Sequence, residues 1–250
     1  MSLKSKLASY WPFPVKARIA GGHSMYVDWR SAVGRGIYAT GTFDPAVLEA
    51  ILKHSEGARG FIDVGANVGF YSFSVSTRLP EGGCVWAFEI DPRPLRCFRK
   101  TLRQPDMFSN ITLVESALGA HQGQVTLEKR PDCGHSQVSS PEDGARGLAV
   151  NMTSLDDWHR DAGRPQVDVI KIDVEGFEGE VLRGAHELLS LETPTLILEV
   201  DDHLLKRVGW DSARLQGLLA EYGYTCVQLA GAHSPTWIAQ SIGESIGSKA

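Results

Sequence analysis

An acid followed by two glycines stands where an apolar segment gives way to a helical pattern. Residues 61–72 read Phe-Ile-Asp-Val-Gly-Ala-Asn-Val-Gly-Phe-Tyr-Ser, so Asp63 closes the apolar run and Gly65 and Gly69 lie four residues apart. Glycine lets the backbone turn tightly and approach a ligand without an intervening Cβ. The free N–H groups of a helix N-terminus attract a carboxylate or a phosphate. The spacing therefore predicts a ligand-binding loop.

The residues of this loop narrow the class of ligand. A dinucleotide loop has the pattern G-x-G-x-x-G, and a phosphate-binding loop has Lys-Ser or Lys-Thr after its last glycine. Here a third glycine is missing, and Phe70 and Tyr71 occupy the place of the lysine and hydroxyl residue. Asp63 suits an ammonium group, and the helix end suits a carboxylate. An amino acid head group fits this loop, which favours S-adenosylmethionine over NAD.

A second acid ends the next apolar strand. Glu89 lies in Phe-Glu-Ile-Asp-Pro (88–92), and a carboxylate at that place can accept hydrogen bonds from both hydroxyls of a ribose. Asp91 is interpreted instead as a turn or helix-capping residue before Pro92. The candidate cofactor-binding residues of the two segments are Asp63, Gly65, Ala66, Asn67, Gly69, Phe70, Tyr71 and Glu89.

Charged residues alternate at the end of another apolar run. Lys171, Asp173 and Glu175 share one side of the chain if the strand stays regular, because successive side chains of a strand alternate. The simplest structural interpretation is a Lys171–Asp173 ion pair, with Glu175 capping the next helix. We expect Asp173 to lie beside the reacting group instead, and we take all three as candidate catalytic residues.

Glu199 ends the following strand and is a further catalytic candidate. Together with Asp173 and Asp201 it forms a cluster of carboxylates, which is typical of a base with a raised pKa or of a divalent cation site. The cation remains an alternative, and no set of metal ligands is assigned, since the four cysteines show no zinc-like spacing.

Histidines are the other candidates for a general base. By position alone, His135 in the polar loop 131–141 and His203 after the last parallel strand rank first. His23 lies in the N-terminal segment. The remaining histidines are interpreted as surface residues: His54, His121, His159, His186 and His233.

Apolar strands and helical segments alternate from residue 60 onward, which predicts a mainly parallel sheet covered on both faces. Strands are expected at 60–64, 84–90, 111–115, 124–128, 148–152, 167–174, 195–200, 224–229 and near Trp237. Helices are expected from Pro45 with Asp44 as N-cap, at 69–79, 93–103, 178–190 and 212–222, with a short one after Leu155. Residues 1–45 are expected to form an arm or lid, and residues 46–250 a single domain.

Composition limits the class of protein. The chain has 250 residues, 42% hydrophobic content and a formal net charge of −5. No dense basic run points to nucleic acid, and no apolar run is long enough to span a bilayer. The cluster of basic residues at 93–103 has helical spacing and is interpreted as a solvated helix face. A cytoplasmic enzyme is the expectation; the sequence gives no indication of oligomeric state.

Five segments carry a resemblance to a known family. They are FIDVGANVGFYS (61–72), FEIDP (88–92), NITLVESALG (110–119), TSLDDW (153–158) and VDVIKIDVEGFEGEVLRGAHELL (167–189). With these segments, in this order, the chain resembles the FkbM family of S-adenosylmethionine-dependent methyltransferases. The resemblance covers about residues 60–200.

The resemblance implies the class I methyltransferase fold, a Rossmann-like three-layer α/β sandwich. Its seven-stranded sheet is mainly parallel, with the last strand antiparallel. By motif, Asp63 to Gly69 correspond to the methionine-binding loop, Glu89 to the ribose-binding acid, and Asp173 and Glu175 to acids facing the methyl group. Ser116, Ala117 and Leu118 correspond to the segment that flanks the adenine, although family members vary at Ser116.

The activity that the resemblance implies is O-methylation of a hydroxyl on a small metabolite, sugar or glycoconjugate. Alternatives are a methyltransferase of the same fold acting on nitrogen or on a protein, and a non-catalytic cofactor-binding module. A methyltransferase acting on nitrogen or on a protein would favour an Asn/Asp-Pro-Pro-Tyr motif. Residues 173–176 read Asp-Val-Glu-Gly instead, which disfavours this alternative. A nicotinamide oxidoreductase is disfavoured by the missing third glycine.

Overall fold

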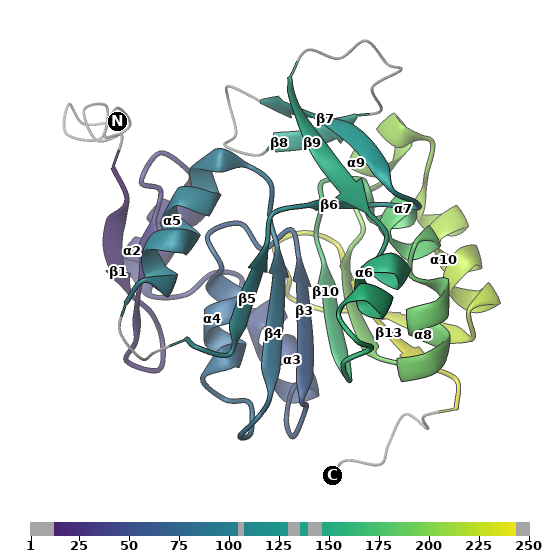
Figure 1. The fold of residues 1–250 in the computed structure, drawn as a ribbon, viewed down its shortest axis with the longest axis horizontal. Coiled ribbons are helices and arrows are strands. Elements are labelled where there is room, and N and C mark those ends of the chain that lie inside the picture. The colour runs from purple at the N-terminus through teal and green to yellow at the C-terminus, as the bar shows by residue number, and fades with distance from the viewer. Residues whose placement is uncertain (1–12, 105–107, 130–135, 140–146, 244–250) are drawn as a thin grey trace.

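A seven-stranded sheet forms the centre of the molecule (Figure 1). The computed structural model describes residues 13–104, 108–129, 136–139 and 147–243. The strands follow the order β12-β13-β11-β10-β3-β4-β5, and only β13 runs antiparallel to its neighbours. Their bounds are β3 Gly60–Val64, β4 Cys84–Phe88, β5 Ile111–Val114, β10 Val169–Ile172, β11 Thr195–Glu199, β12 Tyr224–Gln228 and β13 Thr236–Ser241. The predicted fold class is confirmed.

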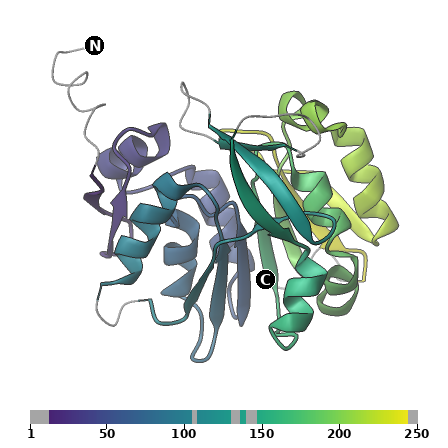
Figure 2. The same ribbon diagram turned by 45° about the horizontal axis from the view of Figure 1, so that its top comes forward.

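Alternating side chains of the strands enter two separate apolar cores. In β3, Phe61 packs on one face and Ile62 and Val64 on the other, as expected for a strand buried on both sides. Helices α3 Pro45–His54, α4 Phe70–Ser76 and α5 Pro92–Leu102 cover the first face. Helices α6 Leu155–Asp161, α7 Glu178–Arg183, α8 His186–Glu192 and α10 Ser212–Glu221 cover the second (Figures 1 and 2). The short α9 Asp202–Leu205 and 3-10 helix Lys206–Val208 follow β11.

The described part of the N-terminal segment packs on the first core. It forms β1 Val15–Arg18, β2 Ser24–Val27 and α2 Ala32–Thr40. Met25, Val27 and Ile37 are fully buried in the same cluster as Phe61. The division into an arm (1–45) and a domain (46–250) stays a prediction.

A second, four-stranded sheet lies beside one end of the central sheet (Figure 1). It consists of β6 Ala117–Leu118, β7 Gly123–Lys129, β8 Ser136–Ser139 and β9 Leu148–Thr153, in the order β6-β9-β7-β8. The strands at 124–128 and 148–152 were expected, but their antiparallel pairing and the two further strands were not. This sheet extends over the carboxyl ends of the parallel strands, where it forms one wall of the cavity described below.

The structure corrects the prediction of one helix. The pattern at 178–190 predicted a single helix, but the chain breaks between α7 and α8. Asp156 of α6 is the cause, because its backbone N–H binds the Gly184 carbonyl at 2.8 Å. Its carboxylate then accepts the N–H groups of Glu187 and Leu188 at the start of α8. A side chain 31 residues before Glu187 in the sequence thus binds the N–H groups at the start of the second helix.

The basic cluster predicted as a solvated helix face lies on α5, where Arg96, Arg99, Lys100 and Arg103 are exposed. Of the helices in the described ranges, none is both long and apolar enough to cross a bilayer.

Candidate functional site

A cavity opens at the carboxyl ends of β3, β4, β10 and β11. The predicted site residues that line it are Gly65, Ala66, Asn67, Phe70, Tyr71, Glu89, Lys171, Asp173, Glu175 and Glu199. Leu127 of β7 and Val138 of β8 close it from the second sheet. Since the carboxyl ends of parallel strands meet at one edge, the predicted residues that follow these four strands converge here.

The glycine loop between β3 and α4 is fixed by close backbone contacts. Gly65 has a φ of +75°, and a Cβ there would lie 1.9 Å from the Asp173 carbonyl oxygen. Gly69, with a φ of +86°, begins α4 against the ring of Phe98. The N–H groups of Gly65 and Ala66 both bind the Phe88 carbonyl, at 3.0 and 2.9 Å. Both glycines are therefore required by the geometry of the loop.

Glu89 lies across the loop and binds its backbone. One carboxylate oxygen accepts the Asn67 N–H at 2.7 Å, and the other accepts those of Ile90 and Asp91, each at 2.7 Å. Burial raises the pKa of Glu89 to about 7, although the three hydrogen bonds oppose the shift. A carboxylate so oriented keeps lone pairs for further donors. Glu89 can therefore hold a diol from a fixed position.

Asp63 has no exposed surface and does not line the cavity. One oxygen accepts the N–H and hydroxyl of Ser72, at 3.1 and 2.6 Å, and the other lies 3.4 Å from the Lys171 ammonium. The expected contact of Asp63 with the ammonium group of a ligand stays a prediction. The ammonium group that it faces belongs to the chain itself.

Lys171 joins the loop to the acids of β10. Its ammonium lies 3.3 Å from the Asp173 carboxylate and donates to the Gly65 carbonyl at 3.3 Å. Burial alone would lower the pKa of Lys171, but the charges of Asp173 and Asp63 outweigh it and raise the pKa above its ordinary value. Lys171 is thus a permanent cation, which suits a structural role and not that of a base.

Asp173 and Glu199 share a proton on adjacent strands. Burial, the charge of Asp173 and a hydrogen bond with Asp173 raise the pKa of Glu199 to about 10. Glu199 is therefore protonated at neutral pH, and the pair carries one negative charge. Burial and then the charge of Asp173 also raise the pKa of the Tyr71 phenol beside them.

Asp173, Glu175 and Glu199 each place an oxygen within 4.8 Å of the others. Such crowding fits either a cation or a shared proton. Asp201, which the sequence grouped with these acids, caps α9 instead. The divalent cation that the sequence left open gains no support.

The predicted regular alternation ends before Glu175. Strand β10 stops at Ile172, and Glu175 has a φ of +56° in a tight turn with Gly176. The carboxylate that binds this turn belongs to Glu178, which accepts the N–H groups of Val174 and Gly176. The alternative in which Glu175 caps the next helix is not found, because the N-cap of α7 is Phe177.

Several predicted residues lie away from the cavity lining. Ala117 and Leu118 form β6 of the second sheet, and the hydroxyl of Ser116 before them donates to the Asn151 carbonyl of β9. Their place beside an adenine stays a prediction. His203 is exposed on α9. His135 lies outside the described residues.

The sequence missed Asp44 and His233 as site residues. Asp44 is the N-cap of α3, as predicted, and its other oxygen accepts the N–H of His233 at 2.7 Å. Both residues line the cavity. No local pattern identifies His233, because it lies in the loop between β12 and β13 and reaches the site only through the fold.

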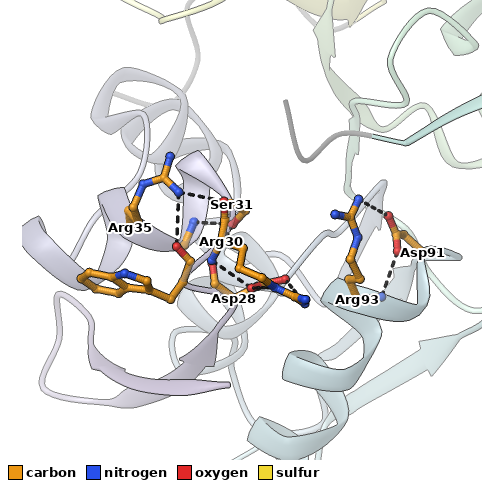
Figure 3. A network of polar contacts seen from close by, with 8 residues as sticks. Asp28, Arg30, Ser31, Arg35, Asp91 and Arg93 are labelled. Atoms are coloured by element: carbon orange, nitrogen blue, oxygen red, sulfur yellow. Dashed lines mark hydrogen bonds and ion pairs between the residues drawn. The ribbon is translucent and has the colours of Figure 1, made fainter. Parts of the chain in front are cut away.

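The N-terminal segment supports the cavity near Asp91 (Figure 3). Asp91 caps α5 through the Arg93 N–H, as the sequence indicated. Opposite it, the Asp28 carboxylate binds the Arg30 guanidinium at 2.9 Å. Burial would raise the pKa of Asp28, but the bonds from Arg30 hold it below its usual range. The Asp28–Arg30 ion pair thus holds the turn that precedes Val33, and Val33 lines the cavity.

Comparison with known proteins matches this architecture to one family. A family model described as the methyltransferase FkbM domain matches residues 63–226. The methyltransferase sdnD of Sordaria araneosa is 26% identical over 156 residues, which cover 50% of this chain and 60% of that protein. The hexuronic acid methyltransferase AglP of Haloferax volcanii is 27% identical over 138 residues, which cover 55% of this chain and 54% of that protein. The chain thus spans little more than half the length of each relative.

A solved structure shows the same fold. The methyltransferase FkbM from Methylobacillus flagellatus KT superposes with a TM-score of 0.51 at 18% identity, over 74% of this chain and 44% of that one. At this identity the likeness is one of fold.

Replacing Lys171 tests whether it holds the site together. In Lys171→Met, the Asp63 carboxylate keeps Ser72 but loses its buried counter-charge, so we expect a loss of about 3–5 kcal/mol in unfolding free energy, measured by urea denaturation. The control Lys206→Met removes an exposed lysine 3.9 Å from Asp202 and should cost less than about 1 kcal/mol. Equal stability of the two variants would contradict a structural role for Lys171.

Proposed function

Because the chain belongs to the methyltransferase FkbM domain family, we propose that it is an S-adenosylmethionine-dependent methyltransferase that methylates a hydroxyl of a small metabolite, sugar or glycoconjugate. One observation carries the proposal. The cavity brings together a glycine loop, the Glu89 carboxylate held by backbone N–H groups, and the acid pair Asp173–Glu199.

The residues at the loop fit a nucleoside with an amino acid tail. Glu89 is held by three backbone N–H groups, so its remaining lone pairs face the cavity at a fixed place for a ribose diol. The positive φ of Gly65 brings bare backbone to the cavity, and Phe70 and Tyr71 supply apolar and aromatic surface. Since Asp63 is enclosed, we assign it to holding Lys171 rather than to contact with the cofactor.

The acid pair supplies the electrostatic part of the site. S-adenosylmethionine, when bound, supplies a methyl group on a positively charged sulfur. The single negative charge of Asp173 and Glu199 favours a cation beside it, and Lys171 fixes Asp173 in place. The second sheet closes the cavity through Leu127 and Val138, which removes water from the reacting atoms. The chain thus mainly aligns two reactants.

The acceptor class rests on the relatives. The name of the Haloferax volcanii protein states an action on hexuronic acid, which supports a sugar or glycoconjugate here. A hydroxyl acceptor also needs a base for its proton.

Cofactor binding tests the assignment of the loop. Isothermal titration should show binding of S-adenosylhomocysteine and none of NAD. Glu89→Gln places an amide against backbone N–H groups and should weaken binding about 10- to 100-fold, as for the loss of hydrogen bonds to a charged group. The control Glu115→Gln removes a carboxylate that pairs with Arg99 on α5 and should bind normally. Binding of NAD alone would refute the proposal.

The pH dependence of that binding follows from Glu89. Its pKa of about 7 means that the carboxylate forms as pH rises through 7 and is lost below it. Only the carboxylate accepts both ribose hydroxyls, so affinity for S-adenosylhomocysteine should increase between pH 6 and 8 and level off above. In Glu89→Gln, affinity should increase less between pH 6 and 8 than in the wild type. If the pH dependence of affinity is the same in both proteins, a group other than Glu89 causes it.

Removing the charge of Asp173 tests the electrostatic role. Asp173→Asn should lower the rate of methyl transfer about 10- to 100-fold, while affinity for S-adenosylhomocysteine, which lacks the positive charge, changes less than about threefold. Rates are measured on a p-nitrophenyl glycoside that the wild type methylates, with Glu221→Gln on α10 as control. Equal losses of binding and rate would instead indicate a structural role.

A further inference from the structure

A histidine at the cavity edge is paired with a buried carboxylate that the cofactor assignment does not use. His233 lies in the loop between β12 and β13, and its side chain is 66% exposed. Asp44 faces it from the start of α3, with a side chain only 6% exposed. Both line the cavity.

The contacts hold the histidine backbone on the acid and bring one ring nitrogen near it. The backbone N–H of His233 donates to one Asp44 oxygen at 2.7 Å, and ring atom Nδ1 lies 3.5 Å from that same oxygen. The other oxygen accepts the Val47 N–H at the start of α3. Asp44 also holds a φ of +35°, a conformation that a non-glycine residue adopts at a cost. Asp44 is thus immobilised, and Nε2 stands on the side of the ring opposite to it.

The same loop reaches the acid pair. Ser234, the next residue, forms a hydrogen bond with Glu199. Asp44, Asp173 and Glu199 all act on the pKa of Tyr71. The Asp44–His233 pair and the Asp173–Glu199 pair therefore occupy the same end of the cavity.

Other groups there are poorly suited to accept a proton. Glu199 already carries one at neutral pH, and Lys171 is a permanent cation held by Asp63 and Asp173. Asp173 is engaged by the Lys171 ammonium at 3.3 Å and by a hydrogen bond with Glu199. An unprotonated imidazole nitrogen, by contrast, is a common general base.

We propose that His233 is the general base that takes the proton of an acceptor hydroxyl, with Asp44 as the positioning residue that keeps Nδ1 protonated. The inference rests on the proposed function and deepens it by naming the base. It also predicts that the acceptor is a hydroxyl, since a carboxylate acceptor is already ionised and needs no base.

The reaction balances with these groups. The hydroxyl proton passes to Nε2 while the acceptor oxygen forms a bond to the methyl carbon. The bond from that carbon to sulfur breaks, and its electron pair stays on the sulfur, which becomes neutral. The imidazolium left on His233 is stabilised by Asp44 and releases its proton to solvent, to which the ring is exposed.

The first test needs no acceptor. In ¹⁵N-histidine NMR spectra of the full chain at pH 8, His233 should be the tautomer with a proton on Nδ1 and none on Nε2. Asp44→Asn keeps an oxygen for the Val47 N–H but presents an amide to the ring, and should shift His233 toward the other tautomer. A wild-type His233 protonated on Nε2 would overturn the proposal.

The second test measures methyl transfer to matched probes, p-nitrophenyl glucoside and p-nitrophenyl glucuronide, with S-adenosylmethionine. His233→Ala should lower the rate of ether formation about 100-fold or more, with affinity for S-adenosylhomocysteine within about twofold of wild type. Added imidazole should restore part of the rate. His203→Ala, which removes an exposed histidine on α9, should match wild type.

The outcomes separate the two proposals. An unimpaired rate in His233→Ala, or products that are only alkali-labile methyl esters of the glucuronide, would refute the base assignment and leave the methyltransferase proposal intact. Absence of S-adenosylhomocysteine binding by the wild type would refute the proposed function itself. In that case the NMR spectra would still show which nitrogen of His233 carries the proton beside Asp44.

Discussion

The Lys171 ammonium lies between two carboxylates on neighbouring strands, and the site depends on that placement. Asp63 is its cross-strand partner in the pairing of β10 with β3, and both side chains are buried on the face covered by α4. An uncompensated charge in such a place would be costly, so neither residue is tolerable alone. The pairing therefore fixes the register of the two central strands at their carboxyl ends.

The same ammonium group connects three parts of the cavity. It binds the Gly65 carbonyl, which sets the glycine loop, and the Asp173 carboxylate, which sets the acid pair. Ser72 holds Asp63 from α4 and so ties the helix N-terminus to this cluster. A loop suited to a nucleoside and a pair of acids suited to a sulfonium are thus held at a constant separation. This rigidity is what a reaction governed by alignment requires.

Much of the fold, and the part of the cavity assigned to the cofactor, could be predicted because they depend on residues that lie close together in the sequence. Gly65 and Glu89 directly follow the apolar strands β3 and β4, and parallel strands bring such ends to one edge. What the sequence could not reveal depends on contacts between distant segments. Asp44 was recognisable as a helix cap, but its second oxygen binds a backbone group 189 positions away. Likewise, the enclosure of Asp63 depends on Ser72 and Lys171, and no local pattern around Asp63 indicates these partners.

The central claim is that one cavity holds S-adenosylmethionine with its ribose at Glu89 and its sulfur beside Asp173 and Glu199. A crystal structure of the chain with S-adenosylhomocysteine measures this directly. The account predicts both ribose hydroxyls within hydrogen-bond distance of Glu89, the sulfur at the acid pair, and Asp63 still bound to Lys171 and Ser72. A ligand whose ribose lies away from Glu89, or whose amino group displaces Lys171 from Asp63, would contradict it.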